Sequence, residues 1–131
     1  MAKSKSQAKP KPTDAELGIL RVLWERGACT VREVQEALNA REKGRETGYT
    51  TVLKFLQIMT EKRLVVRDET KRTHVYAAAQ PAEVTQRSLV RDLLDRAFGG
   101  SARKLVMQAL QEKKASAEEL AEIRKLLDQM T

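Results

Sequence analysis

The chain has 131 residues, of which 41% are hydrophobic, 33% charged and 4% aromatic, and its net charge is +7. This length allows one domain with an appended element. There is no apolar run of the ~18 residues that cross a membrane, and no apolar stretch follows the basic start as it does in a secretory signal. The single cysteine excludes an internal disulfide and a cysteine-based metal cluster, so we expect a cytoplasmic protein without a cofactor.

Residues 1–12 are expected to form a disordered basic arm. They contain four lysines and no acidic residue, so they carry more than half of the positive excess. Their Lys, Ser, Gln and Pro content cannot build a core. Two interpretations of the arm stay open, namely non-specific affinity for DNA and no specific role.

Capping boxes mark the first two expected helices. Thr13 and Glu16 open a helix, because the hydroxyl and the carboxylate can each accept an amide of the first turn. Gly27 ends this helix. Thr30 and Glu33 open a second helix that ends at about residue 40. The first helix has an apolar stripe at helical spacing, formed by Leu17, Ile19, Leu20, Leu23 and Trp24.

A third helix follows the polar connector 41–46. It begins between residues 47 and 50 and runs to about Arg63. One apolar stripe is expected to face the core, and it consists of Val52, Phe55, Leu56 and Met59. The opposite face presents Thr50, Thr51, Lys54 and Gln57.

The sequence period then changes from 3.6 to 2, which predicts a β-hairpin. The expected strands are Val65–Arg67 and Thr73–Tyr76, and Asp68–Arg72 forms a charged tip. Three helices followed by a hairpin are the order of a winged helix-turn-helix. We therefore predict a mainly α fold whose residues 13–79 form a winged-helix DNA-binding domain.

Residues 80–131 are expected to form a helical dimerisation region. Three short amphipathic helices follow one another, and a third capping box at Ser116 and Glu119 opens the last of them. These helices lack a core of their own, so a second copy of the chain is the simplest cover for their apolar stripes. The expected interface residues are Leu94, Phe98, Leu105, Val106, Leu110, Leu120, Ile123, Leu127 and Met130.

The third helix is expected to read DNA, because the N-terminal part of such a recognition helix enters the major groove. Thr50 and Thr51 can contact base edges or thymine methyl groups, while Lys54 and Gln57 suit guanine and adenine acceptors. The alternative is that the threonines only cap the helix and that Lys54 is only solvated. Tyr49 could equally contact a phosphate or act as a packing lid.

Basic side chains around this helix are candidates for phosphate contacts, which position a protein without selecting a sequence. Arg67, Lys71 and Arg72 ring the hairpin tip, where a wing meets the DNA backbone or minor groove, although charged tips are also commonly just solvated. The other candidates are Arg45, Lys62 and Arg63.

Three conspicuous residues receive a structural interpretation. We expect His74 at the surface, Cys29 as a small buried residue and Trp24 in the core. No Ser/His/Asp set, phosphate-binding glycine loop or committed carboxylate pair occurs in the sequence. An enzyme is therefore not expected.

Residues 13–131 resemble the penicillinase repressor family of bacterial regulators, the BlaI/MecI/CopY group. The resemblance covers about nine-tenths of the chain and both expected regions. The matching segments are Thr13–Trp24, Thr30–Val34, Gly48–Lys54, Lys62–Val66, Phe98–Gly100, Leu105–Met107 and Ser116–Leu127.

This resemblance implies a homodimeric repressor on an inverted-repeat operator with TACA/TGTA-like half-sites. In antibiotic-responsive members, an upstream membrane sensor-protease leads to repressor cleavage at an Asn-Phe bond. Here Gln108-Ala109 stands at the matching position, which puts such cleavage in doubt. Copper-responsive members end in a cysteine-rich metal motif, whereas residues 128–131 contain no cysteine, so copper sensing is not expected.

Two other classes of function are alternatives. A winged-helix protein-interaction module would need an acidic or apolar recognition face, and Thr50, Thr51 and Lys54 argue against it. A non-specific architectural DNA binder would rely on the basic arm and the wing.

Overall fold

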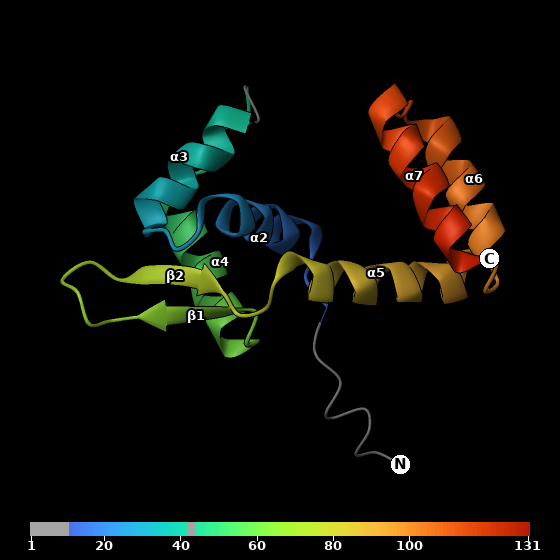
Figure 1. The fold of residues 1–131 in the computed structure, drawn as a ribbon. Coiled ribbons are helices and arrows are strands. Elements are labelled where there is room, and N and C mark those ends of the chain that lie inside the picture. Colours follow the sequence, from blue (N-terminus) through green and yellow to red (C-terminus); the bar gives the residue numbers. More distant parts are fainter. Residues whose placement is uncertain (1–10, 42–43) are drawn as a thin grey trace, which may run out of the picture. The chain divides into compact units, whose positions relative to one another are not determined.

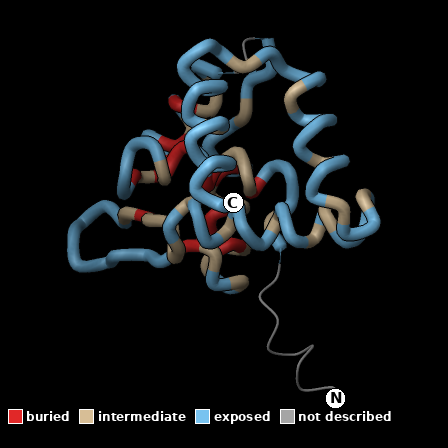
Figure 2. Tube along the Cα trace, turned by 45° about the vertical axis from the view of Figure 1, so that its right-hand side comes forward, coloured by how far each residue is buried: buried red, intermediate tan, exposed pale blue. Residues whose placement is uncertain are grey.

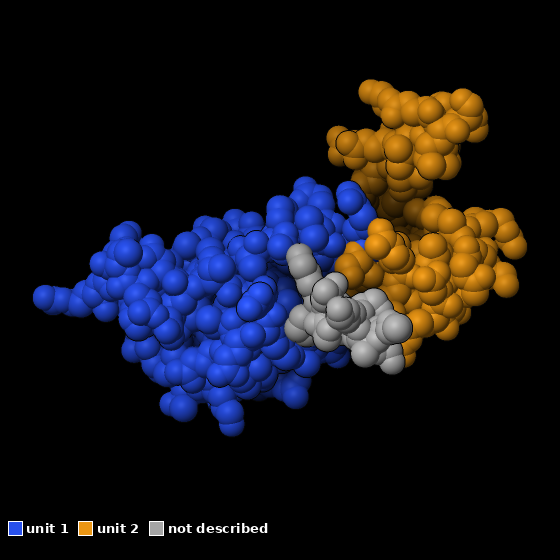
Figure 3. Space-filling view, turned by 90° about the horizontal axis from the view of Figure 1, so that it is seen from below, with its two compact units in different colours: residues 1–87 blue, residues 88–131 orange. Residues whose placement is uncertain are grey.

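The computed structural model describes residues 11–41 and 44–131 (Figure 1). The arm expected at residues 1–12 therefore lies almost wholly outside the described residues. The elements are α2 (Asp14–Arg26), α3 (Val31–Arg41), α4 (Tyr49–Glu61), β1 (Val65–Asp68), β2 (Val75–Ala78), α5 (Ala82–Ala97), α6 (Ala102–Glu112) and α7 (Ala117–Met130). The chain divides into two compact units between Arg87 and Ser88, within α5 (Figure 3).

All three predicted capping boxes are present. At the start of α2, the Thr13 amide donates to Oε1 of Glu16 at 2.9 Å, and the Glu16 amide donates to Oγ1 of Thr13 at 3.2 Å. Thr30 with Glu33 and Ser116 with Glu119 repeat this arrangement before α3 and α7. Helix α2 ends as predicted, with Gly27 at φ 85°, a backbone conformation that costs glycine little.

The hairpin is antiparallel, with Val65 opposite Ala78 and Asp68 opposite Val75. The second strand was predicted at Thr73–Tyr76 but lies two residues later, at Val75–Ala78. Core packing explains the shift, because this register buries Tyr76 beside Val65, each 1% exposed. The charged tip is correspondingly longer than the sequence predicted.

A backbone contact that the sequence did not predict borders the hairpin. The link between α2 and α3 forms an antiparallel bridge from Cys29 to Tyr76. The Cys29 amide donates to the Tyr76 carbonyl oxygen at 2.9 Å, and the Tyr76 amide donates to the Cys29 carbonyl oxygen at 2.8 Å. The bridge joins the hairpin to the helices and buries Cys29, as the sequence predicted.

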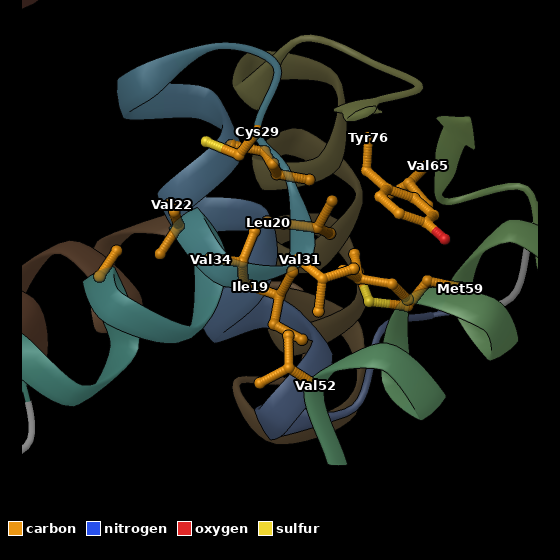
Figure 4. Packing of buried hydrophobic residues seen from close by; sticks show 13 residues of the cluster. Ile19, Leu20, Val22, Cys29, Val31, Val34, Val52, Met59, Val65 and Tyr76 are labelled. Carbon is orange, nitrogen blue, oxygen red and sulfur yellow. The ribbon is translucent and has the colours of Figure 1, made fainter. Parts of the chain in front are cut away.

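The hydrophobic core lies within the first unit, among α2, α3, α4 and the hairpin (Figure 4). Its members are Ile19, Leu20, Val22, Leu23, Cys29, Val31, Val34, Ala37, Val52, Leu56, Met59, Val65 and Tyr76. Trp24 packs against this core at its edge, and its Nε1 donates to the Gln80 carbonyl oxygen at 3.0 Å. The helical and hairpin elements occur in the predicted order, so the first unit is a winged helix.

The second unit differs in its burial. Helices α5, α6 and α7 contain no buried residue (Figure 2). Ser101 caps α6 by accepting the Lys104 amide at 3.2 Å, so these helices begin with ordinary local signals. Of the helices described, none has both the length and the apolar character needed to span a membrane.

Candidate nucleic-acid interface

Helix α4 has one buried and one exposed face. Val52, Leu56 and Met59 are each 0% exposed, as the predicted stripe requires, while Phe55 is half-buried at the core edge. The four predicted reading residues lie on the solvent side, namely Thr50, Thr51, Lys54 and Gln57. The core thus fixes which side of the helix an external partner can meet.

The start of α4 lacks a side-chain cap. Gly48 occupies the N-cap position and makes no side-chain hydrogen bond there. Thr50 and Thr51 lie within the first helical turn rather than at the N-cap position, so their hydroxyl groups do not serve as N-cap acceptors. The alternative that these threonines serve only as caps loses its basis. Thr50 and Thr51 are both exposed at this end of the helix.

Tyr49 begins α4, and 42% of its surface is exposed. The Arg32 guanidinium of α3 lies 5.6 Å from the centroid of its ring. This distance is within the range of a cation–π contact. The contact leaves part of the surface of Tyr49 exposed.

The connection into α4 is held by amide side chains of α3. Nδ2 of Asn39 donates to the Thr47 carbonyl oxygen at 3.2 Å, and the Thr47 amide donates to Oδ1 of Asn39 at 2.7 Å. Nε2 of Gln35 donates to the same carbonyl oxygen at 3.3 Å. Arg45, two residues before Thr47, is exposed.

The wing carries its basic residues at or near an exposed tip. Arg67, Lys71 and Arg72 are all exposed. A hydrogen bond with the Tyr76 side chain, reinforced by an ion pair with Glu69, raises the pKa of the Arg67 guanidinium. Arg67 is therefore tied to the hairpin itself, whereas Lys71 and Arg72 extend from its tip.

An Asx-type turn shapes the beginning of this tip. The Thr70 amide and hydroxyl donate to Oδ1 of Asp68 at 2.9 and 2.7 Å. These two hydrogen bonds stabilise the charged form and hold the pKa of Asp68 below its ordinary value. The turn gives the segment that leads to Lys71 a defined local structure.

Lys62, at the end of α4, forms an ion pair inside the first unit. Its Nζ lies 2.9 Å from Oε1 and 3.0 Å from Oε2 of Glu16, whose side chain is only 3% exposed. Burial alone would raise the pKa of Glu16, but hydrogen bonds from the Thr13 backbone and from Lys62 hold it below its ordinary value. The ammonium group of Lys62 is thus paired with a carboxylate of the protein itself.

Arg63 follows in a left-handed backbone conformation, with φ 66°. The Leu64 amide donates to the Met59 carbonyl oxygen at 2.8 Å, which closes the end of α4 in the manner of a Schellman motif. Glycine is the usual residue at such a position. Here an exposed arginine occupies it.

The nine predicted interface residues of the C-terminal region are not buried within the chain. Five of them are half-buried, namely Leu94, Phe98, Leu105, Leu110 and Ile123. The other four are Val106, Leu120, Leu127 and Met130, which are 47%, 39%, 55% and 73% exposed. Leu110, Ile123 and Leu126 also line a shallow hollow along α6 and α7.

A match to a known family decides the identity. The sequence profile described as "Penicillinase repressor" matches residues 12–129. The chain belongs to the penicillinase repressor family. The resemblance seen in the sequence is thereby confirmed, and the chain is a transcriptional repressor rather than an enzyme.

Individual relatives agree with this membership. "Transcriptional regulator BlaI" of Mycobacterium tuberculosis is 32% identical over 118 residues, covering 89% of this chain and 83% of the relative. The solved complex structure of hsRosR-S4 is 21% identical, covers 98% of this chain and 95% of its own, and gives a TM-score of 0.54. The structure of H. salinarum RosR is 20% identical and gives a TM-score of 0.53, with 93% of this chain and 96% of its own covered. The RosR similarity concerns the fold alone.

A third relative is BlaI of Bacillus licheniformis, solved in its monomeric form in complex with the blaP half-operator. It is 21% identical and covers 58% of this chain and 89% of its own, with a TM-score of 0.48.

Sequence reasoning did not find several contacts of this repressor, and three of them connect separate segments of the first unit. They are the bridge between Cys29 and Tyr76, the ion pair of Glu16 with Lys62, and the hold of Asn39 on Thr47. Each joins residues from different elements, so local periodicity carries no sign of it. A weak signal existed for the last, because Gln35 and Asn39 are four residues apart and share one face of α3.

Proposed function

We propose that this repressor binds an inverted-repeat DNA operator as a homodimer in the cytoplasm. Residues 13–79 form the DNA-binding domain and residues 80–131 the dimerisation region. The observation that carries the proposal is the exposed face of α4, where Thr50, Thr51 and Lys54 stand opposite a fully buried stripe.

The chemistry of this face suits the major groove. Threonine offers a hydroxyl and a methyl group, while Lys54 and Gln57 donate to purine acceptors. Tyr49 directs its exposed edge to a phosphate or sugar. The uncapped amides of the first turn add donors for a phosphate oxygen, since a helix N-terminus favours negative charge.

Phosphate contacts are proposed to orient the domain. Lys71 and Arg72 reach the backbone or minor groove from the wing, and Arg67 supports them from its place on the hairpin. Arg45 and Arg63 contact the backbone at the two ends of α4. Lys62 contributes less than the sequence suggested, because Glu16 already neutralises its charge.

Homodimerisation is proposed on the apolar stripes of the second unit. Leucine, valine and methionine side chains that are about half exposed in a single chain lose this surface when a second copy covers them. The two linked DNA-binding domains of the dimer then reach two half-sites that lie one turn of the DNA helix apart. The linkage makes the second contact effectively intramolecular.

An upstream sensor-protease is the further partner that the family resemblance suggests. Gln108 and Ala109 are exposed on α6, but they differ from the Asn-Phe pair. We therefore do not propose this bond as the point of cleavage. A sensor-protease gene beside that of the repressor would support such a partner.

Selection of duplexes from a random-sequence pool by the full chain tests the proposal. We expect an inverted repeat to be enriched, and Lys54→Ala and Thr51→Ala to weaken binding to it about tenfold while the circular dichroism spectrum stays unchanged. Gln86→Ala, an exposed amide on α5, is the matched control. Enrichment of no sequence would favour the architectural DNA binder instead.

A truncated chain that lacks residues 101–131 tests the dimer. We expect a folded monomer that binds the selected repeat poorly, because one half-site loses its tethered partner. Analytical ultracentrifugation measures the mass. A truncated chain that still sediments as a dimer would move the interface to the first unit.

A further inference from the structure

The side chain of Asn39 satisfies both backbone polar groups of Thr47. It donates to the carbonyl oxygen and accepts from the amide, at 3.2 and 2.7 Å. A neighbouring β-strand would supply the same pair of contacts. Asn39 and Thr47 are both half-buried, so an unmade hydrogen bond there would be costly.

Asn39 belongs to a row of three polar residues on α3, which we call the α3 polar stripe. Its members Arg32, Gln35 and Asn39 are spaced three and four residues apart and so share one helix face. Gln35 donates to the Thr47 carbonyl oxygen at 3.3 Å, and Arg32 lies over the Tyr49 ring at 5.6 Å. The stripe therefore contacts the chain at the two residues that flank Gly48.

Local signals for the start of α4 are weak. The other helix starts at Thr13, Thr30 and Ser116 have capping boxes, but Gly48 has no side chain to form one. Glycine also leaves the backbone its full conformational freedom. Side-chain contacts at this helix start come instead from the α3 polar stripe.

We propose that Asn39 is a positioning residue for sequence recognition. It fixes Thr47 and thereby sets where Thr50 and Thr51 meet the bases, without touching DNA itself. The role requires both a donor and an acceptor on one short side chain, which the carboxamide of Asn39 provides on two separate atoms. This inference rests on the proposed function.

The test compares Asn39→Ala and Asn39→Asp with the wild-type full chain. The probes are the duplex enriched by the wild type and an unrelated duplex of the same length. We expect both variants to lose about tenfold in affinity for the enriched duplex. Alanine removes both hydrogen bonds, whereas aspartate can still accept from the Thr47 amide but places an oxygen against the Thr47 carbonyl oxygen in place of a donor. Affinity for the unrelated duplex and its salt dependence should stay unchanged, because the phosphate contacts remain.

Hydrogen exchange of the free protein provides a readout that needs no DNA. In Asn39→Ala we expect faster exchange of the amides of residues 47–52, with unchanged protection at Leu20 and Val34. Gln35→Ala removes only the longest of the three hydrogen bonds and should lose two- to threefold in affinity for the enriched duplex. It keeps the test valid where Asn39→Ala is too unstable to assay.

The possible outcomes separate the two hypotheses. An Asn39→Ala variant that binds the enriched duplex within twofold of wild type overturns the positioning role alone. Equal losses on both duplexes also overturn it, because they indicate a merely structural residue. A wild type that enriches no sequence overturns the proposed function and this role with it.

Discussion

The two units of this repressor differ in how far they bury their apolar side chains. The first packs three helices and a hairpin around thirteen buried hydrophobic residues. The second consists of the C-terminal part of α5 together with α6 and α7, and none of its residues is buried. Isolated helices of about this length are marginal in water, and apolar side chains of the second unit stay partly exposed in the single chain. The contrast separates a region that buries a core of its own from a region for which we propose a second copy of the chain as apolar cover.

The largest expected effect tests this contrast with one substitution at two places. Leu56→Ala in the core should lower the free energy of unfolding by about 3 kcal/mol, from lost burial and a residual cavity. Leu126→Ala, at a side chain that is 56% exposed, should change the unfolding of the first unit by less than about 0.5 kcal/mol. Urea unfolding followed by circular dichroism measures both. Equal losses would mean that the units do not differ as described.

The ion pair of the first unit gives the next effect. Lys62→Met keeps the aliphatic stem but leaves Glu16 with a buried carboxylate and no cation, which should cost about 2 kcal/mol. Lys104→Met, on exposed α6, should be nearly neutral. Matching losses in the two variants would show that Lys62 acts as an ordinary surface charge.

The same pair predicts how stability depends on pH. The pKa of Glu16 is lowered in the folded state from an ordinary value of 4.5, so its stabilising contribution is complete above that value and is lost as the pH falls through the folded-state pKa. The stability advantage of wild type over Glu16→Gln should therefore shrink below about pH 4.5. Urea midpoints at several pH values measure it, and a constant difference down to pH 3 would contradict the prediction.

A substitution in the second unit should weaken dimerisation and leave the stability of the first unit unchanged. Leu127→Gln places a polar group on the proposed interface and should weaken dimerisation about tenfold or more, because each copy loses burial of a leucine. Lys125→Gln is the polar control on the same helix. Sedimentation over a range of concentrations gives the dissociation constant. An unaltered constant would locate the interface away from α7.

The smallest expected effect concerns backbone strain at the end of α4. Arg63→Gly should raise the stability of the first unit by roughly 0.5 kcal/mol, as relief of the left-handed conformation slightly exceeds the entropy that glycine adds to the unfolded chain. Affinity for DNA should fall at the same time through loss of the proposed phosphate contact. A variant that is less stable than wild type would show that φ 66° stores no strain.

Sequence patterns predicted the parts of this fold that depend on near neighbours. The capping boxes, the end of α2 at Gly27 and the buried stripe of α4 each involve residues within one or two helical turns. The hairpin was predicted, but its second strand was misplaced by two residues, because the register is chosen by the burial of Tyr76 against distant side chains.

The candidate site was predictable only in part for the same reason. The periodicity of α4 separates its outer residues from its core residues, so Thr50, Thr51 and Lys54 could be named from the sequence. The partners of Lys62 and Thr47 lie 46 and 8 residues away in the chain. Their pairing depends on how helices pack, and a one-dimensional pattern does not contain that information.

The hydrogen bond from Trp24 to Gln80 has a practical consequence. Trp24 is the single tryptophan of the chain, and its indole is tied to the backbone two residues before α5 begins. Indole emission depends on local polarity and hydrogen bonding. The intrinsic fluorescence of Trp24 therefore reports on the segment between β2 and α5, and no added label is needed. An inducing signal that alters this segment would appear as a shift of the emission spectrum.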